Sequence, residues 1–237
     1  MHRAVVSPLV ALLVLASPQP AAAQDPGAAL TPLQVSRIER LLETRIACRG
    51  CHQIDGRGGL IGPVLDGIAN RADLNHVLAM IESPAEAVPG TIMPHQPLPD
   101  REAERLARYV IALPAPRAVT GAVPEAPPAL APGQEADGTV LYARHCAACH
   151  GDEGRGDGWN AANLPVPPTV HADAQAMAQR PDDTLFDGIY AGGFVLDKSP
   201  LMPAFGDLLD PGQIRALVGH IRSLCECRQP AWAGGER

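Results

Sequence analysis

Aromatic residues are scarce in this chain, at 3% of its 237 residues. Between Gln24 and Leu113 the sole aromatic side chain is Tyr109. A segment of about 90 residues can form a small domain, but such a domain buries only a modest share of its surface. The first half of the chain therefore lacks an aromatic core of its own, and this indicates that another large apolar body packs there.

Lysine is nearly absent as well, because Lys198 is the single lysine among 19 basic residues. The formal net charge is −7. This balance disfavours nucleic acid or an anionic membrane as a partner. Long apolar runs are lacking after the N-terminus, so we expect no membrane span in the mature chain.

The N-terminus has the pattern of a secretory signal over residues 1–23. His2 and Arg3 precede an apolar run over residues 4–16, and small residues follow at 21–23. The apolar run is short for a membrane span, although an uncleaved N-terminal anchor is the alternative. We expect export to the periplasm.

What the chain does contain is the pattern Cys-X-X-Cys-His, twice and 98 residues apart. Its cysteines and histidines are, in chain order, Cys48, Cys51, His52, Cys146, Cys149 and His150. In such a pattern two thiols bond to the two vinyl groups of a haem, and the histidine binds the iron. The sequence therefore predicts two covalently bound haem c groups.

Other uses of paired cysteines agree less well with the sequence. A thioredoxin-like pair needs a βαβ pattern, and no strand-rich stretch is present. A structural zinc site needs four ligands together, but the two pairs lie far apart. Two local disulfides would leave His52 and His150 without a role.

A proline-rich stretch at residues 114–134 divides the chain. We expect an all-α fold with a signal peptide at residues 1–23, one domain at 24–113 and another at 135–227. A short tail at 228–237 follows. The long linker would let the two domains reorient, and a rigid tandem with contacting haems is the alternative.

Each domain has helical periodicity before its motif and again at its end. Thr31 begins a capping box, and its helix is expected to run directly into Cys48. The predicted caps of the other helices are Asp100, Asp137 and Asp210.

Each domain also has a Met-Pro pair between its motif and its closing helix. Met93 lies 41 residues after His52, and Met202 lies 52 residues after His150. A thioether is a soft ligand suited to haem iron, and histidine–methionine ligation raises the reduction potential. We predict Met93 and Met202 as the second axial ligands.

Other side chains compete for this role. Met80 and Met177 lie in helical stretches, which favours core packing. His95 and His171 lie in loops, and either would give a bis-histidine site of lower potential.

On these motifs each domain resembles a class I cytochrome c, over residues 30–113 and 137–225. The resemblance implies that the carbonyl of Pro63 accepts a hydrogen bond from His52. The second domain has no Gly-Pro pair in its loop, where Pro165, Pro167 or Pro168 would serve. The single lysine excludes the lysine ring by which mitochondrial cytochrome c docks.

The resemblance also points to differences between the domains. The family usually has an aromatic residue in the closing helix, where Tyr109 fits, but the second domain has His220 there.

The loop after the second motif is rich in glycine and contains the acidic residues Asp152, Glu153 and Asp157. We interpret it as a solvated loop rather than as a calcium site.

Cys225 and Cys227 end the last helix. They are compatible with a strained disulfide, free thiols, an intermolecular link or a soft-metal site.

Two filled axial positions leave no open site for a substrate. We therefore predict an electron-transfer protein, not an enzyme in itself, that relays electrons between periplasmic or membrane-bound redox proteins. A dihaem enzyme of the peroxidase or thiosulfate-oxidising type is the alternative, with one haem either left open or bound by the thiolate of Cys225 or Cys227. A third interpretation is a tethered module within a larger complex.

Overall fold

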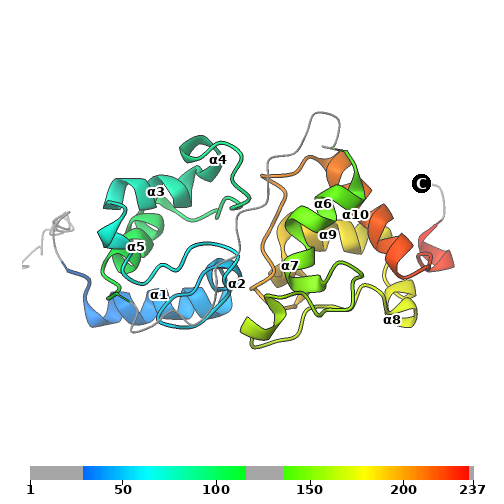
Figure 1. Cartoon of the computed structure of the whole chain (residues 1–237), viewed down its shortest axis with the longest axis horizontal. Coiled ribbons are helices and arrows are strands. Elements are labelled where there is room, and N and C mark those ends of the chain that lie inside the picture. The colour runs from blue at the N-terminus through cyan, green and yellow to red at the C-terminus, as the bar shows by residue number, and fades with distance from the viewer. Residues whose placement is uncertain (1–28, 116–135, 235–237) are drawn as a thin grey trace, which may run out of the picture.

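The computed structural model describes residues 29–115 and 136–234. Figure 1 shows two helical bodies side by side, one for each Cys-X-X-Cys-His motif. The predicted signal peptide and nearly all of the predicted linker lie outside the described residues. Those that are described form no β-strand beyond an isolated bridge between Ile54 and Arg57, so the all-α prediction is confirmed.

The described helical elements fall into two sets, one for each body. In the first body they are α1 (Pro32–Thr44), α2 (Cys48–Cys51), the 3₁₀ turn η1 (Ile68–Asn70), α3 (Leu74–Glu82), α4 (Pro84–Ala87) and α5 (Asp100–Ile111). In the second body they are α6 (Gly138–His145), α7 (Ala147–His150), η2 (Ala161–Asn163), α8 (Ala174–Ala178), α9 (Asp182–Ala191), η3 (Gly193–Leu196), α10 (Pro211–Leu224) and η4 (Ala231–Ala233).

The capping box of α1 has the form predicted for it. The Gln34 amide donates to Thr31 Oγ1 at 3.3 Å, and the Thr31 amide donates to Gln34 Oε1 at 2.7 Å. A cap of this kind stabilises a helix by about 1 kcal/mol. The expected continuous helix is wrong, because α1 ends at Thr44 and Cys48 begins the separate helix α2. Ile46 lies between them and is still buried, so packing rather than helix continuity explains its spacing.

The predicted caps of the later helices have a mixed outcome. The carboxylate of Asp137 accepts from the first amides of α6, and Asp210 forms a second capping box at α10. Asp100 does not cap α5, since Pro99 occupies that position and Asp100 is the first helical residue. Its negative charge in the first turn still suits the helix dipole.

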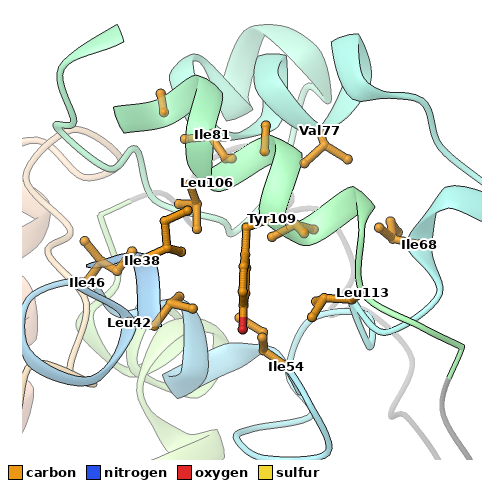
Figure 2. Packing of buried hydrophobic residues seen from close by; sticks show 13 residues of the cluster. Ile38, Leu42, Ile46, Ile54, Ile68, Val77, Ile81, Leu106, Tyr109 and Leu113 are labelled. Carbon is orange, nitrogen blue, oxygen red and sulfur yellow. The ribbon is translucent and has the colours of Figure 1, made fainter. Parts of the chain in front are cut away.

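The core of the first body surrounds Tyr109. Figure 2 shows its ring on α5 among aliphatic side chains, including Leu42 of α1 and Ile54 of the following loop. Tyr109 and its aliphatic neighbours are almost completely buried. Burying one such side chain contributes about 1.5–3 kcal/mol, so this cluster of one ring and many aliphatic side chains stabilises the packing of α1 on α5.

The second body takes its buried aromatic ring from its first helix instead. Tyr142 of α6 is 1% exposed and packs with Leu141, Ile214 and Leu217 against α10. The His220 ring of α10 lies 4.9 Å from the Tyr142 ring, centroid to centroid. The packing of the closing helix therefore differs between the two domains, with His220 where the first domain has Tyr109.

The two bodies are in contact. Arg144 Nη2 of α6 donates to the Gly90 carbonyl at 3.0 Å, and His95 Nδ1 lies 3.0 Å from Asp207 Oδ2. The described residues therefore show two domains that dock against each other, while the contact between haems that the alternative includes stays a prediction. No helix in the described ranges is long and apolar enough to cross a membrane.

Candidate functional site

The first Cys-X-X-Cys-His motif forms α2 and the residue after it. Cys48 and Cys51 are free, partly buried thiols. Burial raises the pKa of Cys48 to about 11 and that of Cys51 to about 12. Both are therefore protonated at neutral pH. The cysteines of the second motif are free as well, which argues against the two local disulfides.

The ring of His52 is oriented by the loop after the motif. Its Nδ1 lies 2.7 Å from the Pro63 carbonyl oxygen, the partner that the resemblance implied. A carbonyl only accepts, so Nδ1 carries the proton and Nε2 keeps its lone pair. Burial lowers the pKa of His52, which favours this neutral, metal-binding form.

An apolar cavity of about 420 Å³ adjoins His52. Cys48, Cys51 and His52 lie on its wall, and so do Met93 and Met80. The Met93 loop is fixed locally, since the Met93 amide donates to Thr91 Oγ1 at 3.1 Å. The interpretation of Met80 as a core residue needs correction, because it is partly exposed and faces this cavity.

His95 is directed elsewhere. Its Nδ1 contacts Asp207 of the second body, and more than a third of its side chain is exposed. The His95 ring therefore takes part in the contact between the two bodies, which argues against His95 as an iron ligand.

The second motif repeats the histidine arrangement with a different partner. His150 Nδ1 lies 2.9 Å from the Thr169 carbonyl oxygen. The expected partners Pro165, Pro167 and Pro168 are therefore wrong, by one residue in the last case. A main-chain carbonyl can come from any residue type, so no side-chain pattern could have identified Thr169.

His171 lies beside His150, with stacked rings 4.1 Å apart. The hydroxyl of Tyr142 lies 2.9 Å from His171 Nδ1, and this pair is buried. Burial, with a smaller contribution from His150, lowers the pKa of His171 to about 2. Because its ring stacks on that of His150, His171 is poorly placed to act as a second ligand in the same site.

Met202 lies in a loop that Gly193 supports. The Gly193 amide donates to the Met202 carbonyl at 3.1 Å. A Cβ on Gly193 would lie 2.3 Å from the Ser199 carbonyl oxygen, so only glycine fits there. Met202 packs against the second core. Met177 is fully buried, and Arg180 Nη1 lies 3.2 Å from its sulfur, in agreement with a core role.

Both halves of the chain match family models. Residues 35–114 match "Cytochrome c", and residues 133–221 match "Cytochrome C oxidase, cbb3-type, subunit III". The chain belongs to the c-type cytochromes. It contains two cytochrome c domains in tandem, and two such domains fit two covalently bound c-type haems.

Two solved structures are similar to parts of this cytochrome. The KustC0563 c-type cytochrome is 30% identical, with 37% of this chain and 96% of that chain covered and a TM-score of 0.31. The Kuenenia stuttgartiensis reducing HAO-like protein complex Kustc0457/Kustc0458 is 18% identical, with 64% of this chain and 72% of that chain covered and a TM-score of 0.32. No curated protein matches the chain.

The residues around the first motif fit a haem. The cavity is mainly apolar, two free thiols lie on its wall, and a neutral histidine is held there by Pro63. When bound, the haem supplies one-electron chemistry at its iron. The protein provides the thiols for attachment, orients the imidazole and excludes water from the apolar wall.

Cys225 and Cys227 form a disulfide with each other, with their Cα atoms 5.1 Å apart. This settles the alternatives that the sequence left open, and neither cysteine is a thiolate. Within the described ranges no group of three or more His, Cys, Asp or Glu side chains could hold a metal ion. In the acidic loop after the second motif, Glu153 pairs with Arg155.

Proposed function

We propose that this cytochrome relays single electrons through two haems with histidine–methionine ligation, between redox proteins of the periplasm. Cys48 and Cys51 would attach the first haem, and Cys146 and Cys149 the second. The axial pairs would be His52 with Met93 and His150 with Met202. The observation that carries the proposal is the apolar cavity with His52 and Met93 on its wall.

The polar contacts of the two histidines support this ligation. Each Nδ1 is bonded to a main-chain carbonyl, so each Nε2 is available to iron. The thioether of methionine raises the reduction potential of such a site. This combination suits an electron carrier that accepts electrons from a donor of lower potential.

The ligand assignment is tested by absorption spectroscopy of the ferric holoprotein. Methionine–iron bonds give a weak far-red band, and we expect wild type to show it from both sites. Met93→Ala and Met202→Ala should each remove about half of its amplitude, and the double variant all of it. A wild-type protein without the band would contradict the assignment.

The chain offers a matched control for each ligand. Met80 lines the same cavity as Met93, and Met177 is the buried methionine of the second domain. Met80→Leu and Met177→Leu preserve volume and should leave the band unchanged. If Met80→Leu removes the first-domain signal and Met93→Ala does not, then Met80 is the ligand.

Export is tested separately. We expect the mature protein in the periplasmic fraction, with a mass that begins near Gln24 and includes two haems. A protein that starts at Met1 and sediments with membranes would identify residues 1–23 as an uncleaved anchor.

The alternative of a dihaem enzyme included a thiolate ligand from Cys225 or Cys227. The disulfide between these two residues argues against that ligand. Cyanide or carbon monoxide separates the remaining cases. Rapid binding at one haem would favour an enzyme with an open site, whereas slow binding at both would favour a carrier.

A further inference from the structure

Asn160 joins the two haem-attachment motifs of the chain. It belongs to the second domain, in the loop between α7 and η2, and its side chain is fully buried. Its Nδ2 donates to the Gly50 carbonyl, inside the first motif, at 2.9 Å. The same nitrogen lies 3.3 Å from Cys149 Sγ, in the second motif. One amide nitrogen therefore contacts both motifs.

The other polar atoms of Asn160 are used as well. Its Oδ1 accepts from the Leu60 amide of the first domain at 3.0 Å, and its main-chain amide donates to the Ala148 carbonyl at 2.8 Å. A flipped side-chain amide would set donor against donor at Leu60 and acceptor against acceptor at Gly50. The two contacts thus fix the orientation of the Asn160 amide.

Close backbone packing surrounds this residue. A Cβ on Gly50 would lie 2.2 Å from the Leu201 carbonyl oxygen of the second domain. A Cβ on Gly59 would lie 2.3 Å from the Gly50 carbonyl oxygen and 2.8 Å from Asn160 Oδ1. Leu201 immediately precedes Met202, so the first attachment motif touches the loop of the second proposed ligand. We call this contact region, made by Gly50, Gly59, Leu60, Asn160 and Leu201, the seam.

The chemistry of the seam suits electron exchange between the domains. Cys51 and Cys149 are each proposed to be bonded to a haem, and Cys51 is the neighbour of Gly50. A short path of bonds therefore leads from Cys51 through the Gly50 carbonyl and the Asn160 amide to Cys149. Electron tunnelling rates fall steeply with distance. A short path through the buried amide of Asn160 therefore favours electron transfer between the two haems of one molecule.

We propose that Asn160 is a positioning residue that holds the two attachment motifs together, so that electrons pass directly between the two haems of one molecule. One iron is oxidised as the other is reduced by the same electron, so the step needs no proton, leaving group or co-reactant. The inference rests on the proposed function for the two covalent haems, but not on the identity of their second axial ligands.

Wild-type holoprotein gives the first test. One haem is reduced by a light pulse with a photosensitised donor, and the redistribution of the electron is followed by absorbance or, where the haem spectra overlap, by resonance Raman. We expect a rate that does not depend on protein concentration. A rate proportional to concentration would show exchange between molecules and overturn the proposal.

The second test compares Asn160→Ala with the matched control Asn70→Ala, which replaces an exposed asparagine of the first domain. Because Asn160→Ala leaves the Gly50 carbonyl and the Leu60 amide without their buried partner, we expect the exchange rate to fall about tenfold. Amide hydrogen exchange at Leu60 should speed up in the same variant. Asn70→Ala should change neither quantity.

Gly50→Ala disrupts the seam from the first domain, because the added Cβ would collide with the Leu201 carbonyl oxygen. This variant tests the proposal if Asn160→Ala does not fold. Its added methyl group should also slow the exchange. Loss of Leu60 protection with an unchanged electron-exchange rate, in either variant, would overturn the role of the seam. The far-red band separates this outcome from failure of the ligand assignment, because the band should persist in Asn160→Ala and in Asn70→Ala.

Discussion

Gly62 lies against the ring of His52, and this contact makes its replacement informative. A Cβ at position 62 would lie 2.3 Å from Cε1, 2.7 Å from Nδ1 and 2.8 Å from Nε2 of His52. Carbon atoms in contact normally stay about 3.5–4.0 Å apart, so the Gly62→Ala variant cannot keep the ring in place. Either the packing strains or the ring turns away from Pro63.

The magnitude follows from the less costly of these responses. Overpacking of a tight site costs about 1–3 kcal/mol. Turning the ring breaks the bond to the exposed Pro63 carbonyl, which is worth about 1 kcal/mol. We therefore expect the free energy of unfolding to fall by about 1 kcal/mol. A displaced imidazole should also weaken the iron bond and shift the potential of the first haem.

Denaturant unfolding of the holoprotein, followed by circular dichroism, measures the stability change, and a redox titration measures the potential. Gly219→Ala is the matched control, because Gly219 is exposed on α10 and a Cβ there meets nothing within 4 Å. That control should raise stability by about 0.5–1 kcal/mol. A Gly62→Ala protein with wild-type stability and potential would refute this account of how His52 is held.

Two further predictions concern the second domain. Arg222 donates to Asp182 Oδ1 and to the Met177 carbonyl, both at 2.8 Å, so Arg222→Met should lower the free energy of unfolding by about 3 kcal/mol in a denaturant titration. The exposed Arg215→Met should change it by less than about 1 kcal/mol. Burial lowers the pKa of His145 from 6.5 to about 4, so the folded state binds fewer protons than the unfolded state between these values, and stability is lost as the pH falls through them. This shift corresponds to a loss of about 3 kcal/mol in the free energy of unfolding between pH 7 and pH 4. Unfolding titrations at the two pH values should show that a His145→Phe variant lacks this loss.

The sequence predicts features that side-chain pattern determines. Helical spacing and the capping box at Thr31 locate α1, and Asp210 locates α10 in the same way. Spacing alone could not reveal that α1 ends at Thr44. Ile46 continues the apolar pattern because it faces the same core, although its backbone is no longer helical. Burial and helix continuity give the same sequence signal over so short a stretch.

Features made by the main chain were not predictable in this way. The partner of His150 is the Thr169 carbonyl, which carries no residue-specific signal. The seam has the same character, because it consists of glycines, main-chain groups and a single asparagine. The proline-rich linker suggested independent domains because linker composition reports the stiffness of the connection and says nothing about the surfaces that it joins.

The docking of the two domains bears on how their haems would respond to each other. The Met93 loop is held by the second domain, through Arg144 at Gly90 and Asp207 at His95. The Met202 loop is in turn pressed against Gly50 of the first domain. Each proposed ligand loop therefore rests on the opposite domain. A change of ligand geometry in one domain acts on the packing of the other, so we expect the two reduction potentials to be coupled rather than independent.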